Sequence, residues 1–147
     1  MLIYNYHKNI PEIQGYTCFG IKNEGEKDIA IIGLDVSSGS VMELAILTGE
    51  IDTTIPEQDV TSEVINGRLG DSAESGARIF SNPTLIAPTT VIKTATIQDG
   101  VQTKVLDRGH GIVIPTGKAV SIRVVPSRVF QDFNATLTFV ESEKPMV

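Results

Sequence analysis

The stretch that decides the fold is residues 111–141, GIVIPTGKAVSIRVVPSRVFQDFNATLTFVE. Apolar and polar side chains alternate in it twice, over Ala119–Val125 and again over Ala135–Glu141. A period of two puts successive side chains on opposite faces of a β-strand, so each run predicts a strand with one buried face. The turn residues Pro115-Thr116-Gly117 precede the first run, and Pro126 ends it. We expect the inward set to be Val120, Ile122, Val124, Ala135, Leu137 and Phe139, the outward set to be Ser121, Arg123, Thr136 and Thr138, and Ile114 to join the core.

Upstream of this stretch, turn residues separate a series of short apolar runs. The run Val41–Ile51 also suits a helix, but Gly39 and Gly49 bracket it closely and favour a strand. Asp99-Gly100 is a strong hairpin signal, so the strands on either side of it should pair. The expected strands are Tyr16–Lys22, Asp28–Val36 (in which Ile32, Leu34 and Val36 alternate), Val41–Ile51, Arg78–Phe80, Leu85–Ile86, Val91–Ile97, Val101–Leu106 and Ile112–Ile114, with a short one near Val64.

The runs amount to about eight or nine strands without an amphipathic helix, which indicates an all-β, two-sheet antiparallel jelly-roll-like sandwich. The sandwich should be a single domain over residues 15–147. Residues 1–14 show no clear period and contain Pro11, so we expect an N-terminal arm or an irregular leading segment, and an arm could lie on a neighbouring subunit. Residues 52–76 hold several glycines and many acids and should form a long polar connection.

The composition is that of an ordinary globular protein whose core is rich in β-branched residues. Of its 147 residues, 41% are hydrophobic and 20% are charged, and the formal net charge is −6. An acidic chain lacks the basic surface that nucleic acids attract, so nucleic acid is not an expected partner. No apolar run approaches the roughly 18 residues that a membrane span needs, and the first residues lack the pattern of a secretory signal. We therefore expect a chain made in a cytoplasm, with no membrane partner.

Residue types that carry catalysis are scarce. Only two histidines occur, His7 and His110, whereas the metal site of a cupin-type sandwich enzyme needs several imidazoles and a carboxylate. Asp107 and His110 are close in sequence, but no Gly-x-Ser-x-Gly nucleophile elbow accompanies them. The single cysteine, Cys18, lies in an expected strand and should be a buried, inert thiol. The sequence thus predicts no enzyme, and we assign no catalytic, metal-binding or cofactor-binding residue.

Charged residues divide the chain into an acidic and a basic region. Residues 50–74 carry seven acids against Arg68, and residues 101–130 carry five bases against Asp107. The two regions are either two solvated faces or the two halves of a head-to-tail contact between subunits, which salt would weaken. The acids are Glu50, Asp52, Glu57, Asp59, Glu63, Asp71 and Glu74, and the bases are Lys104, Arg108, Lys118, Arg123 and Arg128.

Some carboxylates are spaced two residues apart. On a strand this spacing puts both on one face, which is compatible with glycosidase chemistry but is typical of a solvated edge or loop. The pairs are Glu24/Glu26, Glu50/Asp52, Glu57/Asp59 and Glu141/Glu143.

The order of elements is also informative. A Gly-aromatic strand leads into an asparagine turn at residues 15–23, GYTCFGIKN, and an aliphatic strand follows at Ile29–Val36. A long middle loop carries Gly70-Asp71-Ser72-Ala73 and Ser81-Asn82-Pro83-Thr84. The Gly-apolar-Pro-x-Gly step of residues 111–117, the alternating strand and a threonine-rich strand that ends in glutamate complete the order. Over residues 15–141 this layout resembles phage virion proteins with a jelly-roll fold, which include capsid decoration, head-fibre and tail-associated modules.

The resemblance implies a non-enzymatic virion structural protein, above all a capsid decoration or head-surface protein on the virion exterior. The implied partners are copies of itself, as a homotrimer or another ring, and the major capsid protein or other virion proteins. A receptor- or carbohydrate-binding module of a tail or fibre is the alternative, although the chain has no Trp and only three Tyr and five Phe to stack on sugars. A metal-free sandwich enzyme is a third class.

Overall fold

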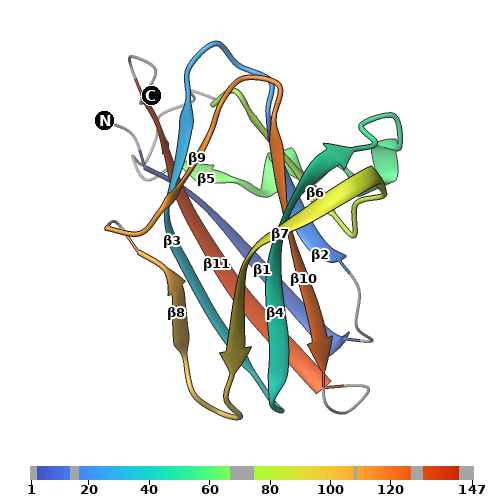
Figure 1. Cartoon of the computed structure of the whole chain (residues 1–147), viewed down its shortest axis with the longest axis vertical. Coiled ribbons are helices and arrows are strands. Elements are labelled where there is room, and N and C mark those ends of the chain that lie inside the picture. Colours follow the sequence, from blue (N-terminus) through green and yellow to red (C-terminus); the bar gives the residue numbers. More distant parts are fainter. Residues whose placement is uncertain (1–2, 14–16, 67–74, 108, 127–130, 143–147) are drawn as a thin grey trace.

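Two antiparallel β-sheets pack face to face in the computed structural model, which describes residues 3–13, 17–66, 75–107, 109–126 and 131–142 (Figure 1). The strands are β1 (Ile3–Ile13), β2 (Thr17–Asn23), β3 (Ile29–Ser38), β4 (Met42–Ile51), β5 (Ile65–Asn66), β6 (Ala77–Ser81), β7 (Leu85–Ile97), β8 (Thr103–Leu106), β9 (Ile112–Ile114), β10 (Ala119–Pro126) and β11 (Gln131–Glu141). Two short 3-10 helices, η1 (Pro56–Gln58) and η2 (Thr61–Glu63), lie between β4 and β5. They and β5 match the expected polar connection with a short strand near Val64.

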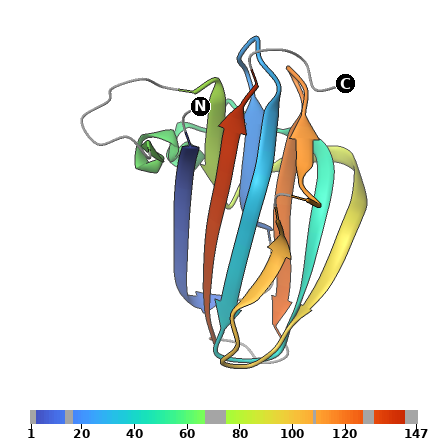
Figure 2. The same cartoon turned by 90° about the vertical axis from the view of Figure 1, so that its left-hand side faces the viewer.

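Most consecutive strands lie in opposite sheets, as in a jelly roll, but β6 and β7 share one sheet and β8 and β9 share the other. Sheet A has the order β5-β1-β11-β3-β8, with β9 also paired to β3, and sheet B has the order β6-β2-β10-β4-β7. Figure 2 shows β1, β11, β3 and β8 side by side, with sheet B behind them. The expected all-β, two-sheet antiparallel jelly-roll-like sandwich is confirmed, with eleven strands among the described residues instead of about eight or nine.

The N-terminal segment is a strand of sheet A. β1 pairs antiparallel with β11 from Ile3↔Val140 to Ile10↔Phe133, and its register shifts beyond Ile10. The expectation of an arm or irregular leading segment over residues 1–14 is therefore wrong for residues 3–13, and the rest of that range lies outside the described residues.

Tertiary packing explains why residues 3–13 form a strand although their sequence has no clear apolar period. Tyr4 and Tyr6 face inward. The centre of the Tyr4 ring lies 5.4 Å from that of Phe139, and the centre of the Tyr6 ring lies 5.6 Å from that of Phe19. Lys8 breaks the apolar alternation, yet its Nζ donates a hydrogen bond to Ser81 of β6 (2.5 Å). A polar contact at this position thus takes the place of an apolar one.

The turn at Asp99-Gly100 joins the two sheets and does not form the expected hairpin. β8 pairs with β3 in sheet A, whereas the preceding β7 pairs with β4 in sheet B, so the expected pairing of Val101–Leu106 with Val91–Ile97 is wrong. Gly100 has φ of 69°, as the turn signal predicts, and its N–H donates to Ser38 O (3.0 Å). A turn signal reports a reversal of the chain, but the partner of the next strand is set by tertiary packing.

The main core lies between the sheets. All seven residues expected to face inward are at most 4% exposed, namely Ile114, Val120, Ile122, Val124, Ala135, Leu137 and Phe139. In β3 the expected alternation fails at Ile32, which is only half-buried, because the register against β11 shifts between Ile31 and Gly33. This β-bulge lets Ile31 and Leu34 both face the core.

A second, smaller core covers part of the outer face of sheet B. Ile51, Phe80 and Ala119 are buried there together, and Leu85 packs against them. Ser121 faces outward from β10 as expected, but it is buried as well. Gly20 makes this packing possible, since a Cβ at that position would lie 2.7 Å from the Ile51 side chain. The end of β4 and the start of β7 therefore cover this part of the outer face.

Candidate interaction surface

The two histidines lie on separate elements and have structural partners. The Nδ1 atom of His7, on β1, lies 3.0 Å from Oγ1 of Thr136, on β11. His110 is exposed in the β8–β9 turn, and its Nδ1 is 3.2 Å from Asp107 Oδ1. This hydrogen bond, with that from Gly109 N–H (3.0 Å), lowers the pKa of Asp107. Asp107 thus caps a turn. Among the described residues, no group of three or more His, Cys, Asp or Glu side chains could hold a metal ion.

Cys18 is fully buried, as the strand pattern predicted. Burial raises the pKa of its thiol to about 12, despite a lowering effect of a backbone hydrogen bond with Val124 and of the nearby Lys8 charge. The reactive form of cysteine is the thiolate, so this residue is chemically inert in the folded chain.

An arginine joins two of the acidic turns. Arg78 of β6 forms ion pairs with Asp59 (2.5 Å) and Glu24 (2.9 Å), and its guanidinium lies 5.2 Å from the centre of the Phe80 ring. Partial burial alone would raise the pKa of Asp59, but hydrogen bonds from Thr61 and Arg78 outweigh burial and hold that pKa below its usual value. The cluster fixes the connection after β4 onto sheet B.

The spaced carboxylates act mainly in turns. Asp52 Oδ1 accepts hydrogen bonds from the backbone N–H (3.0 Å) and the hydroxyl (2.6 Å) of Thr54. Glu141 Oε2 accepts from Gly76 N–H (2.8 Å), while Glu143 lies outside the described residues. None of these contacts brings two carboxylates together around an open site, so glycosidase chemistry finds no support in them.

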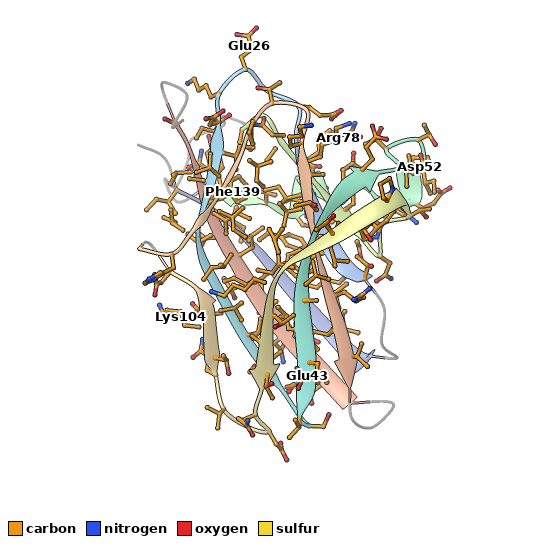
Figure 3. The ribbon with its side chains drawn as sticks, in the orientation of Figure 1. Glu26, Glu43, Asp52, Arg78, Lys104 and Phe139 are labelled. Carbon is orange, nitrogen blue, oxygen red and sulfur yellow. The ribbon has the colours of Figure 1, made fainter. Side chains whose placement is uncertain are left out.

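The acidic and basic regions are only partly separated in space, because Glu50 and Lys118, one from each region, line the same groove. Figure 3 shows Asp52 at one side and Lys104 at the other. Lys104 is mostly exposed, and its Nζ forms an ion pair with Asp35 Oδ1 at 3.8 Å. Arg68, Asp71, Glu74, Arg108 and Arg128 lie outside the described residues. The placement is compatible with either of the two interpretations of the charge pattern.

Strand β7 is an edge of sheet B that exposes large apolar side chains. Its strand partner among the described residues is β4 alone. Ile86, Val91 and Ile92 are each 45–47% exposed, and the strand's thirteen residues include one charge, Lys93. Long, apolar, sparsely charged edges are typical contact surfaces. The two apolar runs were expected as separate strands, and the low charge of Leu85–Ile97 was the signal in the sequence that could have revealed this surface.

A groove of about 520 Å³ opens beside β7. Ile92 of β7 and Val113 of β9 line it and are also partly exposed at its rim, while Val120 of β10 lies deeper. Glu50 and Lys118 line the same groove. Both charges are exposed, and neither has an ion-pair partner in the part of the chain that the structure describes. The groove therefore combines apolar walls with one unpaired charge of each sign.

A second groove, of about 500 Å³, is lined by both polar and apolar residues and lies beside η2 and β5. Its lining includes Asp59, Thr61 and Ser75. The Asp59 carboxylate already binds Thr61 and Arg78, and Ser75 Oγ accepts from Ala77 N–H (3.1 Å). These polar groups hold the loop in place, so this groove is the weaker candidate.

No family model matches the chain, and comparisons with curated proteins and with solved structures found no match either. Among the residues that the structure describes, no helix has the length and apolar character to cross a membrane. The exposed apolar side chains of β7 and the groove beside it make the candidate interaction surface.

Proposed function

We propose that this chain is a non-enzymatic structural protein of a phage virion, in particular a capsid decoration or head-surface protein. It is made in the host cytoplasm and assembles on the exterior of the particle with its own copies and with the shell. The jelly-roll connectivity supports this proposal, since it is the fold that the resemblance implies. The observation that carries the proposal is the exposed apolar edge of β7.

Association is the mechanism that this edge favours. Full burial of an Ile or Val side chain contributes roughly 1.5–3 kcal/mol, so covering the exposed half of Ile86, Val91 and Ile92 would contribute about 1 kcal/mol each. Jelly-roll proteins of a shell need such surfaces, because their work is to hold neighbours in place. Catalysis needs converging reactive side chains, which the edge does not present.

The alternative of a carbohydrate-binding module is less well supported. Sugars stack on exposed aromatic rings, but the six described aromatic residues are at most 4% exposed. These residues are Tyr4, Tyr6, Phe19, Phe80, Phe133 and Phe139. Their rings fill the core between the sheets and the small core outside sheet B.

The test is to look for the chain in purified particles and to disturb the edge. Mass spectrometry of particles from cells that carry the gene should detect the chain at a fixed ratio to the major capsid protein. The variant Ile86→Lys should remain folded by circular dichroism but be lost from the particles. Val101→Lys changes a comparably exposed valine outside β7 and should be retained. A chain that never occurs in particles would overturn the proposal.

A further inference from the structure

We propose that the groove beside β7 is the docking site for a second copy of this chain, in a two-fold contact that sets Glu50 of each copy against Lys118 of the other. The inference rests on one part of the proposed function, namely that the chain acts by association with its own copies. The contact differs from a ring interface, because the same patch is used on both copies.

Charge complementarity identifies the occupant as a second copy. In a two-fold contact, residue i of one copy meets residue j of the other, and j meets i in turn. A patch of a single sign would therefore repel its own copy, whereas this groove carries Glu50 and Lys118, one charge of each sign. Neither charge is paired within the described part of the chain, so both are available to a neighbour.

Apolar side chains supply the centre of the proposed contact. Ile92 and Val113 are 45% and 38% exposed, and both also line the groove. Each copy thus presents partly exposed apolar side chains along its groove, which a second copy would cover. Interfaces of this kind take most of their affinity from the apolar centre, while rim charges select the partner.

The edge of β7 argues for side-chain docking and against continuation of the sheet. Pro88 lacks a backbone N–H, and the register shift between Val91 and Lys93 bulges the strand at Ile92. Proline, lysine and bulges are the devices that block strand addition at sheet edges. A two-fold contact through the groove is complete when two copies have met. Strand addition would instead leave a free sheet edge to which further copies could add.

The test uses a pair of charge reversals in the full chain. Sedimentation equilibrium in low salt should give wild type twice the chain mass of 15.8 kDa. Glu50→Lys and Lys118→Glu should each weaken dimerisation roughly tenfold or more, because each sets like charges together at both ends of the contact. A 1:1 mixture of the two variants should regain the wild-type affinity, since a mixed dimer has an opposite-charge pair at both ends.

The apolar centre is tested separately. Ile92→Lys should abolish the dimer, and Val125→Lys, a matched change at an exposed valine outside the groove, should leave it intact. Circular dichroism of each variant checks the fold. A monomeric wild type, charge reversals without effect, or a mixture that fails to regain the wild-type affinity would each overturn the inference.

The particle experiment is independent of the dimer test. A chain found in particles but monomeric in solution overturns the two-fold contact alone, and a dimer absent from particles overturns the proposed function alone.

Discussion

Asn23 is fully buried although its side chain is polar. Its Nδ2 donates hydrogen bonds to Lys27 O (2.7 Å) and Ile114 O (2.8 Å), and its Oδ1 accepts one from Gly25 N–H (3.0 Å). The side chain therefore ties the turn between β2 and β3 to the end of β9. An amide supplies both donors and an acceptor at this point, which no apolar residue can do.

Replacing Asn23 by alanine should lower the free energy of unfolding by about 2–4 kcal/mol, because each buried group left without a partner costs about 1–3 kcal/mol. Urea unfolding measures the change. Asn23→Asp keeps the shape but loses the donors, so it should cost at least as much at neutral pH. Its cost should shrink on acidification, when a protonated carboxyl regains one donor. A loss below about 0.5 kcal/mol for Asn23→Ala would contradict the role of these bonds.

Asp59 predicts a pH dependence of stability. Its pKa in the folded chain lies below the usual value, so its ionised form favours folding. This contribution is present above the unfolded pKa of about 3.9 and is lost as the pH falls through the folded pKa. Because Asp59 and Arg78 are partly exposed, the contribution should be only about 1 kcal/mol.

Asp59→Asn should therefore be less stable than wild type at pH 7 and equally stable at strongly acidic pH. Urea unfolding across this pH range gives the difference. Glu57→Gln removes an exposed carboxylate two residues away and should change stability by less than about 0.5 kcal/mol at any pH. A gap between Asp59→Asn and wild type that persists unchanged in acid would show that lost packing, and not the charge, accounts for it.

At the scale of elements, Gly49 controls how β4 meets β7. Its φ is 142°, and a Cβ there would lie 2.9 Å from the Thr89 side chain. The register between the strands shifts at this point, between Thr48 and Glu50. The glycine thus lets the chain bend where β7 passes over the end of β4.

Gly49→Ala should destabilise the fold by about 1–3 kcal/mol, because it adds backbone strain and a close contact. Gly100→Ala is the matched control: its φ of 69° is also positive, but nothing lies within 4 Å of the added Cβ. The control should therefore cost only about 1 kcal/mol. Thermal unfolding ranks the two variants, and equal losses would mean that the contact with Thr89 is unimportant.

The elements best predicted from sequence are those in which local pattern and tertiary environment agree. β10 and β11 alternate because each has one face in the main core, so Ile122 and Phe139 were placed correctly. The burial of Ser121 could not be predicted, because the residue that covers this face, Ile51, comes from another strand. The partner of β8 was missed for the same reason, since pairing is decided by contacts distant in sequence.

The interaction surface was less predictable than the fold. A strand is evident from its pattern, but whether it lies at an edge depends on the order of all the strands. Glu50 and Lys118 were assigned to an acidic and a basic region, and only the structure brings them to one groove. Their meeting depends on β4 and β10 being neighbours in sheet B.

For the whole molecule, the central position of the last two strands predicts how truncation acts. β10 lies between β2 and β4 in sheet B, and β11 lies between β1 and β3 in sheet A. A chain that ends at Lys118 keeps nine of the eleven described strands but loses the middle of both sheets. It should show no cooperative unfolding transition and no β-sheet circular dichroism signal, in contrast to the full chain. A folded truncated chain would contradict this topology.

The pairing of β1 with β11 also determines when the protein can fold during its synthesis. Ile3 must wait for Val140, the residue opposite it, before the ladder is complete. Ribosomes add about 5–20 residues per second, so β1 waits roughly 7–27 s for its partner. Until then each sheet lacks its middle strand, and contacts so distant in sequence form slowly even afterwards. An interrupted chain therefore leaves the ribosome unfolded, and only finished copies present the apolar edge and groove to a partner.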